Sequence, residues 1–210
     1  MLNAANGHMA QALERPGCAV CTALAEDEAR WMEAYWREAM FDDAARARFF
    51  DAGGFCRHHA WVLHRQAKAT GYGSAVSFLY GNLARRDSDL LGRGRPKLLR
   101  RKARCRACTV MDEAAERKAG FLAEVLAEEP LRVRYAAGDG LCYAHLELTS
   151  ERASKPVTAF LLEDWRARLE TLRAALAEYD RKRDHRFNTE PKGDEQRSWT
   201  DVIRRYVGDP

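Results

Sequence analysis

Hydrophobic positions recur at helical spacing along most of the chain. In the first half they are Leu24, Trp31, Tyr35 and Trp36, and in the second half Val110, Phe121, Leu122, Val125 and Leu126. These intervals of one or two turns predict amphipathic helices. We expect helices from about Ala19 to Met40, across Asp43 to Asp51, and from Phe55 onward. No stretch shows convincing period-two alternation, so a sheet is not expected and the fold class is all-α.

The same order of elements recurs downstream. One helix should end near Glu129-Pro130 and a short one should cover Leu131 to Ala137, with glycines before the next start. The longest helix is expected from about Pro156 to Asp184. A last helix, capped by Ser198 or Thr200, carries apolar residues that we expect to pack back onto the bundle, with docking onto a partner as the alternative. These apolar residues are Trp199, Val202, Ile203, Tyr206 and Val207.

All six cysteines fall in four short motifs. The motifs are Cys18-Ala-Val-Cys21, Cys56-Arg-His-His59, Cys105-Arg-Ala-Cys108 and Cys142-Tyr-Ala-His145. The chain thus carries C-x2-C followed by C-x2-H twice, with 34 and 33 residues between the two motifs of each copy. The offset between the copies is 87 residues at the first cysteine and 86 at the histidine. Such periodicity predicts a duplicated helical unit.

Later positions also align in the two copies. They are Phe78-Leu79 with Phe160-Leu161, Leu83 with Trp165, Arg86 with Arg168, and Leu90 with Leu172. We therefore expect a first metal-binding repeat over residues 1–92, a basic linker over 93–104, a second repeat over 105–185, and a C-terminal connector with a short helix over 186–210.

Three thiolates and one imidazole form a usual ligand set for structural zinc. We expect one Cys3His site in each repeat: Cys18, Cys21, Cys56 and His59 in the first, and Cys105, Cys108, Cys142 and His145 in the second. An alternative pairing joins the two C-x2-C knuckles in a four-cysteine site. The expected metal is Zn2+, two per chain, and an iron–sulfur cluster is the alternative. Disulfides would leave the matched histidines unexplained.

Acidic residues and an additional histidine near the expected sites are interpreted as residues without a role in metal binding. Glu26 and Glu113 stand five residues after the second cysteine of each C-x2-C motif. They are interpreted as helix-face charges, because the helix dipole favours anions in the first turns. The neighbouring acids are Asp27, Glu28, Asp112 and Glu116. His58 has no counterpart in the second copy, where Ala144 stands. None of these residues is included in the expected sites.

A basic run joins the two copies. From Arg93 to Arg106 there are eight basic residues in fourteen positions and no acid. Gly92-Arg93-Gly94-Arg95-Pro96 resembles the core of an AT-hook, which binds the minor groove of A·T-rich DNA. Nucleic-acid binding is possible through this run, but a solvated basic linker is favoured.

Composition and charge narrow the class of protein. The 210 residues, 46% hydrophobic and 31% charged, are typical of a globular protein, and the net charge of +4 does not by itself indicate a nucleic-acid partner. We expect no membrane span and no secretory signal, and hence a cytoplasmic protein. The sequence has no Ser/His/Asp ordering, phosphate loop or nucleotide fingerprint, so we expect no enzymatic activity.

The chain resembles an uncharacterised bacterial and archaeal family with paired C-P-x-C and G-[FL]-C-x-x-H motifs. The matching residues run from Cys18 to Val207 and include the C-terminal R-F-x-x-E-P and S-W stretches, although both knuckles lack the proline. The resemblance implies the metal ligands and adds no reaction. The leading hypothesis is a non-enzymatic zinc protein that serves as an interaction or regulatory module for a protein partner. The alternatives are an iron–sulfur redox or sensor protein and a nucleic-acid binder.

Overall fold

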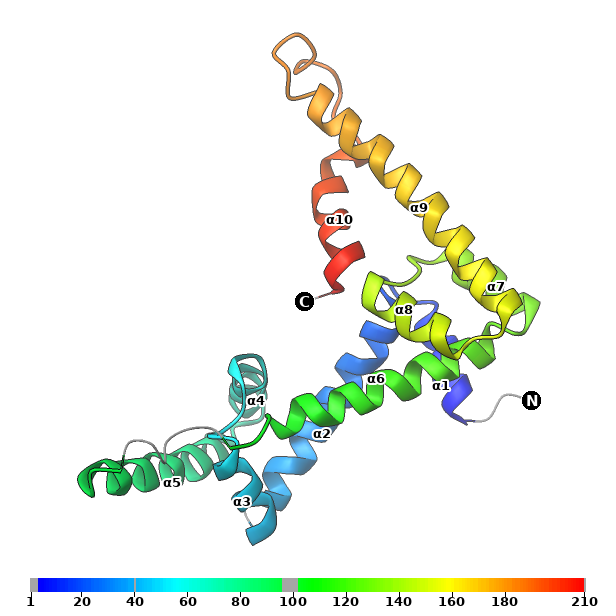
Figure 1. The fold of residues 1–210 in the computed structure, drawn as a ribbon. Helices are drawn as coiled ribbons and strands as arrows, with labels where there is room; N and C mark the ends of the chain where they lie inside the picture. Colours follow the sequence, from blue (N-terminus) through cyan, green and yellow to red (C-terminus); the bar gives the residue numbers. More distant parts are fainter. Residues whose placement is uncertain (1–3, 40, 96–101, 210) are drawn as a thin grey trace. The chain divides into compact units, whose positions relative to one another are not determined.

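The computed structural model describes residues 4–39, 41–95 and 102–209, and all regular structure in these ranges is helical (Figure 1). The all-α expectation is therefore confirmed. The helices are α1 (Ala4–Ala12), α2 (Ala19–Ala39), α3 (Asp43–Asp51), α4 (Arg57–Thr70), α5 (Gly73–Gly92), α6 (Arg106–Val125), α7 (Glu129–Ala137), α8 (Tyr143–Arg152), α9 (Lys155–Arg181), the 3-10 helix η2 (Asp194–Arg197) and α10 (Ser198–Val207).

Most helix boundaries lie close to the expected ones. Helix α3 has the expected bounds, and the side chain of Asp42 caps it by accepting a hydrogen bond from the backbone N–H of Ala44 at 2.7 Å. Helix α7 begins at Glu129, two residues early, because Pro130 fits the first turn, where no N–H is required. The expected end of α2 at Met40 lies outside the described residues. Helix α1 was not expected.

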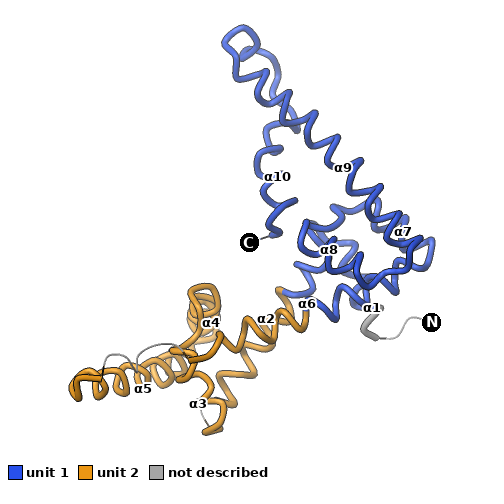
Figure 2. Tube along the Cα trace, in the orientation of Figure 1, with its two compact units in different colours: residues 1–24, 115–210 blue, residues 25–114 orange. Residues whose placement is uncertain are grey.

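The chain forms two compact units, of which unit 1 combines two distant segments and unit 2 is one continuous segment (Figure 2). Unit 1 contains residues 1–24 and 115–210, and unit 2 contains residues 25–114. The sequence suggested boundaries after residues 92, 104 and 185, whereas the contacts divide the chain inside α2 and α6. The start of each of these two helices therefore belongs to a different unit from the rest of the helix.

Unit 2 has an aromatic core that fixes the turn before α4. Phe49 from α3, Phe55, and Leu79 from α5 are buried together, and Phe49 packs edge-to-face on Phe55 at 5.3 Å between ring centroids. Gly54 precedes Phe55 with a φ of +83°, and a Cβ there would lie only 3.2 Å from the Tyr80 ring. Glycine is therefore required at this turn, which leads directly into the C-x2-H motif.

Unit 1 is built around α9 and includes α1 in its core. Met9 from α1 is fully buried with Leu122, Tyr135 and Leu161. The turn before α8 contains Gly140 with a φ of +75°, the counterpart of Gly54. The N-terminal helix thus belongs to the same core as the second half of the chain.

Matched residues of the two copies make matched contacts within their own units. The guanidinium of Arg86 donates to the carbonyl of Phe50 at the end of α3 at 2.6 Å. The guanidinium of Arg168 donates to the carbonyls of Ala136 at 2.9 Å and Gly138 at 2.7 Å, at the end of α7. Each arginine therefore satisfies carbonyls at the end of a short helix. These contacts agree with an internal duplication, which stays a prediction.

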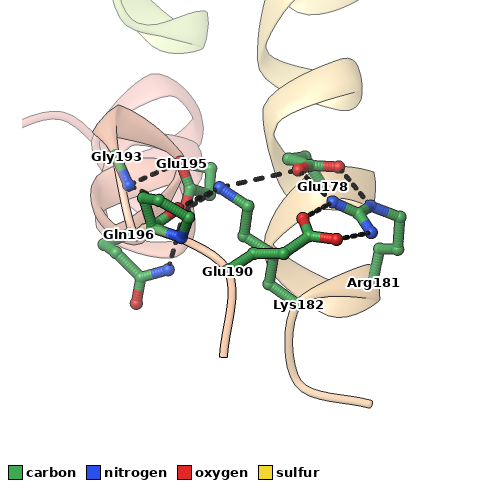
Figure 3. Close-up of polar contacts among 8 residues, drawn as sticks. Glu178, Arg181, Lys182, Glu190, Gly193, Glu195 and Gln196 are labelled. Carbon is green, nitrogen blue, oxygen red and sulfur yellow. Dashed lines mark hydrogen bonds and ion pairs between the residues drawn. The ribbon is translucent and has the colours of Figure 1, made fainter. Parts of the chain in front are cut away.

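The C-terminal connector is held to the end of α9 by ion pairs (Figure 3). Arg181 bonds to Glu178 at 2.7 Å and to Glu190 at 3.1 Å. Lys182 bonds to the carboxylate of Glu195 at 3.1 Å, and that carboxylate also accepts the N–H of Gly193 at 2.9 Å. This network reverses the chain, and α10 then runs back toward α8 (Figure 1).

Helix α10 packs on unit 1 through its polar side, contrary to expectation. Arg205 donates to the carbonyl of Leu141 at 2.8 Å and lies over the Trp165 ring. The apolar residues Trp199, Ile203, Tyr206 and Val207 are between 52% and 74% exposed, and Val202 is half-buried. Tyr206 stacks on Tyr143 of α8 at 6.4 Å between ring centroids. The expectation that the apolar face packs onto the bundle is wrong for Trp199, Ile203 and Val207, because the half-buried Arg205 and the network before α10 set the opposite face inward.

Candidate metal centres

Each C-x2-C knuckle lies at the start of a long helix. Cys18 comes directly before α2 and Cys21 lies in its first turn. In the same way, Cys105 comes directly before α6 and Cys108 lies in its first turn. The two thiols of a knuckle therefore project from a single helical turn.

Each C-x2-H motif lies at the start of a shorter helix. Cys56 and Cys142 are the N-caps of α4 and α8, with extended backbones and no side-chain capping bond. Their thiols are therefore available for other partners. His59 and His145 follow three residues later, close to one helical turn.

The four motifs combine across the two copies. Cys18 and Cys21 lie with Cys142 and His145, all in unit 1. The second group is formed in unit 2 by Cys56, His59, Cys105 and Cys108. The expected pairing within each copy is wrong, and so is the alternative in which the two knuckles meet. The expectation failed because two crossings of the chain, through α2 and α6, exchange the knuckles between the units.

In the centre of unit 1 the three sulfur atoms and one imidazole nitrogen lie close together. The Nδ1 atom of His145 lies 3.4 Å from the Sγ of Cys18, 3.3 Å from that of Cys21 and 3.2 Å from that of Cys142. The sulfur atoms of Cys21 and Cys142 are 3.8 Å apart. Cys18 and Cys142 are buried, and the other two residues are half-buried.

The centre of unit 2 has the same arrangement. The Nδ1 atom of His59 lies 3.1 Å from the Sγ of Cys56, 3.7 Å from that of Cys105 and 3.4 Å from that of Cys108. The sulfur atoms of Cys56 and Cys108 are 3.6 Å apart. His59 and Cys105 are buried. In both units the nitrogen that faces the thiols is Nδ1.

These distances fit a single tetrahedral ion. Zn–S bonds of about 2.3 Å and Zn–N bonds of about 2.0–2.1 Å imply tetrahedral S–N edges of about 3.5 Å and S–S edges of about 3.8 Å. The observed S–N separations are 3.1 to 3.7 Å and the S–S separations 3.6 to 3.8 Å. All six cysteines are free, and a disulfide needs sulfurs only about 2.05 Å apart. Both groups could therefore hold a metal ion.

Charge in both groups is distributed as expected for metal ligands. Burial alone would lower the pKa of His59, but hydrogen bonds with Cys105 and Glu28 raise it to about 10. Burial opposes the ionisation of Cys105, but the hydrogen bond from His59 lowers its pKa to about 6. Both shifts favour the thiolate and imidazolium forms of this pair over the neutral forms. Metal binding must displace the imidazolium proton, so uptake is coupled to proton release.

The unit 1 centre holds a similar pair. Hydrogen bonds from Cys18 and Cys21 lower the pKa of the Cys142 thiol, and the Cys142 contact raises the pKa of Cys18 well above its usual value. Burial disfavours the charged form of His145, yet its bonds with Cys142 and Cys21 raise its pKa to about 9. Each centre thus already favours one ionised sulfur.

A carboxylate that the sequence interpretation left out touches the unit 2 centre. The Oε1 atom of Glu28 lies 3.0 Å from the Nε2 of His59 and 2.8 Å from the Nε2 of His58. Both histidines hold the pKa of Glu28 below its usual value, although burial alone would raise it. Glu28 and His58 lack counterparts in the second copy, so the search for repeated residues could not find them.

The residues that follow α10 lie against the unit 1 centre. The carboxylate of Asp209 accepts the backbone N–H of Cys18 at 3.0 Å, and that of Asp139 accepts the N–H of Gly17 at 2.6 Å. Gly208, with a φ of +85°, lies so close to the thiols that a Cβ there would be 3.0 Å from the Sγ of Cys21. The residues after α10 therefore cover this centre.

The basic side chains described in the run from Arg93 to Arg106 belong to neither ligand group, although Cys105 of the unit 2 group lies within the run. Residues 96–101 lie outside the described residues, and Arg93, Arg95, Arg104 and Arg106 are exposed. Arg104 forms an ion pair with Asp112. Nucleic-acid binding through Arg93–Arg106 stays a prediction.

Comparison with known proteins identifies the family. Residues 9–203 match a family of unknown function, DUF6062. The chain belongs to this family. No curated protein and no solved structure matches it. The resemblance to a family without assigned activity is thus confirmed.

The matched range of the DUF6062 chain contains both candidate centres and most of α10. Among its described residues, no helix combines the length and the apolar character that crossing a bilayer requires.

Proposed function

We propose that this DUF6062 protein holds two structural Zn2+ ions, one in each unit, and acts as a non-enzymatic interaction or regulatory module. One observation carries the proposal: in each unit three sulfur atoms and an imidazole Nδ1 converge from the starts of two helices that are far apart in the sequence. Four protein donors fill a tetrahedral coordination sphere, as in structural sites, and leave no position for a reacting water.

The proposed ions act as cross-links. One joins the start of α2 to the start of α8 through Cys18, Cys21, Cys142 and His145; the other joins the starts of α6 and α4 through Cys105, Cys108, Cys56 and His59. Structural zinc in small domains contributes on the order of 10 kcal/mol of apparent binding free energy. Each ion would therefore fix a long-range contact that hydrophobic burial alone leaves weaker.

The compactness of the ligand sets favours one ion over a cluster. All ligand atoms in each group lie within 4.8 Å of one another. A cluster would distribute its ligands over several iron atoms, which separates ligand atoms bound to different irons further than those that share one ion. A compartment that keeps thiols reduced, such as the cytoplasm, would preserve all six ligands.

The interaction role is supported by α10. Its apolar residues Trp199, Ile203 and Tyr206 are each more than half exposed, whereas its polar side contacts unit 1. Exposed aromatic and aliphatic side chains on one helix face are typical of surfaces that bind another protein.

Metal analysis of protein purified without oxygen tests the metal assignment. We expect a colourless protein with two zinc ions per chain, measured by elemental analysis against amino-acid quantification. Replacement of zinc by Co2+ should give the intense visible bands of tetrahedral thiolate coordination. Brown protein that contains iron and absorbs near about 400 nm would replace the zinc proposal with the cluster, and protein without bound metal would overturn both.

A further inference from the structure

The contact between Glu28 and His59 reaches the ligand from the side opposite the thiols. The Nδ1 atom of His59 faces the three sulfurs, and its Nε2 atom lies 3.0 Å from the Glu28 carboxylate. The Glu28 side chain is 17% exposed and the His59 side chain 7% exposed, so water competes little for this bond. With a metal on Nδ1, the proton resides on Nε2 and is donated to the carboxylate.

His58 holds the same carboxylate from a second direction. Its Nε2 lies 2.8 Å from the Glu28 Oε1 atom, and its ring meets that of His59 edge-on at 4.9 Å between centroids. Glu28 comes from α2 and both histidines come from α4. The carboxylate is therefore placed between two imidazoles of one helix and cannot move away without losing both bonds.

The unit 1 centre lacks this arrangement. Glu28 stands seven residues after Cys21, and the residue seven positions after Cys108 is Ala115; the residue before His145 is Ala144. The bonds that the structure gives for His145 join its Nδ1 atom to the three sulfur atoms. The two residues that anchor His59 are thus both missing where His145 binds.

Such an anchor affects metal binding through the ligand that it holds. A carboxylate on the distal nitrogen fixes the tautomer and the ring orientation of a ligating histidine and increases its basicity, and loss of such a partner typically costs 10- to 100-fold in metal affinity. An imidazole without this partner can rotate and exchange tautomers more freely.

Building on the proposed function, we propose that the two metal centres are unequal: Glu28 is a positioning residue that anchors His59, so the unit 2 centre retains its ion longer than the unit 1 centre. The prediction concerns rates of metal release and the environment of one ligand. It does not require that either centre be catalytic.

The test uses the full chain loaded with 113Cd2+, which reports each thiolate centre as a separate NMR resonance. Glu28→Gln keeps an oxygen acceptor but removes the charge, and Glu28→Ala removes both. Glu33→Gln is the matched control, because Glu33 lies on the same helix and forms an exposed ion pair with Arg37. We expect both Glu28 variants to shift the resonance of the unit 2 centre, with the larger shift for alanine, and the control to shift neither.

Release of Zn2+ to a chelator provides the second measurement. We expect two phases in the unsubstituted protein, and in Glu28→Ala the slow phase should accelerate about 10- to 100-fold while the fast phase stays unchanged. In 15N spectra of the metal-loaded protein, the Nε2–H group of His59 should show the shift of a strong hydrogen bond only while Glu28 is present. A general loss of stability would accelerate both release phases together. Loss of the Glu28 anchor should instead change the His59 signal and the slow phase alone.

Two outcomes would overturn the inference. If the protein binds two ions but the Glu28 variants leave both resonances and both phases unchanged, the anchor has no effect and only this inference fails. If the unit 1 centre proves to be the slower one, the predicted order is wrong. A protein that binds no metal would instead contradict the proposed function itself.

Discussion

The Sγ atom of Cys18 lies 3.4 Å from the Nδ1 atom of His145, although 127 residues separate them in the sequence. The corresponding contact in unit 2 joins Cys105 and His59 over 46 residues. Each knuckle therefore meets the C-x2-H motif of the other copy. Closing such long loops costs conformational entropy, so an ion that holds them closed should contribute strongly to stability.

Combined substitutions test which ligands share an ion. Cys18→Ser and Cys142→Ser should each lose one metal, and the double variant should also lose only one, because both side chains belong to the unit 1 centre. Cys18→Ser combined with Cys56→Ser should lose two, because these cysteines lie in different units. Elemental analysis of the purified variants gives the counts directly.

The opposite pattern has a definite meaning. If Cys18 with Cys56 lost a single ion and Cys18 with Cys142 lost two, each copy would hold its own metal and the exchanged pairing would be wrong. Limited proteolysis adds a control, since a single ligand variant should expose cleavage sites mainly within the unit that lost its ion.

A substitution after α10 should disturb only the unit 1 centre. In Gly208→Ala the new Cβ would lie 3.0 Å from the Cys21 Sγ and 3.5 Å from the Cys142 Sγ, at a φ of +85° that L residues rarely adopt. We expect faster release of one ion, with the second ion unaffected. Gly71→Ala is a suitable comparison: its φ is +75°, but its Cβ would meet no atom within 4 Å. If Gly208→Ala releases its ions no faster than Gly71→Ala, the predicted contact of the new Cβ with the thiols does not weaken the unit 1 centre.

Truncation of a buried leucine should lower the unfolding free energy much more than truncation of an exposed isoleucine. Leu79 and Leu161 are fully buried in units 2 and 1, and each truncation to alanine should cost about 2–5 kcal/mol of unfolding free energy. Ile203 is 54% exposed on α10, so Ile203→Ala should change stability by about 0.5 kcal/mol or less. Chemical denaturation of the metal-loaded variants measures these differences. A large loss for Ile203→Ala would show that its face is covered within the folded chain.

Local patterns in the sequence predicted the helices and the ligand types well. Spacing of apolar residues placed α2, α3 and α9 within a few residues, and the C-x2-C and C-x2-H motifs identified the eight side chains that form the two groups. These features depend on neighbours within one or two turns. Helix α1 escaped prediction because its burial of Met9 depends on residues more than a hundred positions away.

The pairing of the motifs could not be deduced from spacing. A duplicated pattern is equally compatible with ligands joined within a copy or between copies, and the choice depends on where α2 and α6 lead the chain. The same limit applies to α10, whose apolar stripe suggested an inward face, although the contacts of Arg205 and Asp209 turn its polar side inward. In both cases the outcome depended on contacts between residues far apart in the sequence.

The connector before α10 should make stability depend on pH in the acid range. Hydrogen bonds from Gly193, Gln196 and Lys182 lower the pKa of Glu195 to about 2, compared with about 4.3 for a free glutamate. A carboxyl with a lowered pKa in the folded state stabilises that state above the unfolded pKa, and this stabilisation is lost as the pH falls from about 4.3 toward 2. Glu195→Gln should therefore be less stable than the unsubstituted protein at pH 7.

The measurement is the difference in unfolding free energy between the two proteins as a function of pH. We expect the difference to be constant from pH 7 to about 5 and to shrink between about 4.3 and 2, because protonated Glu195, like glutamine, carries no negative charge to strengthen these bonds. Loss of metal at low pH affects both proteins and cancels in the difference. A pH-independent difference for Glu195→Gln would mean that the carboxylate charge does not hold the connector.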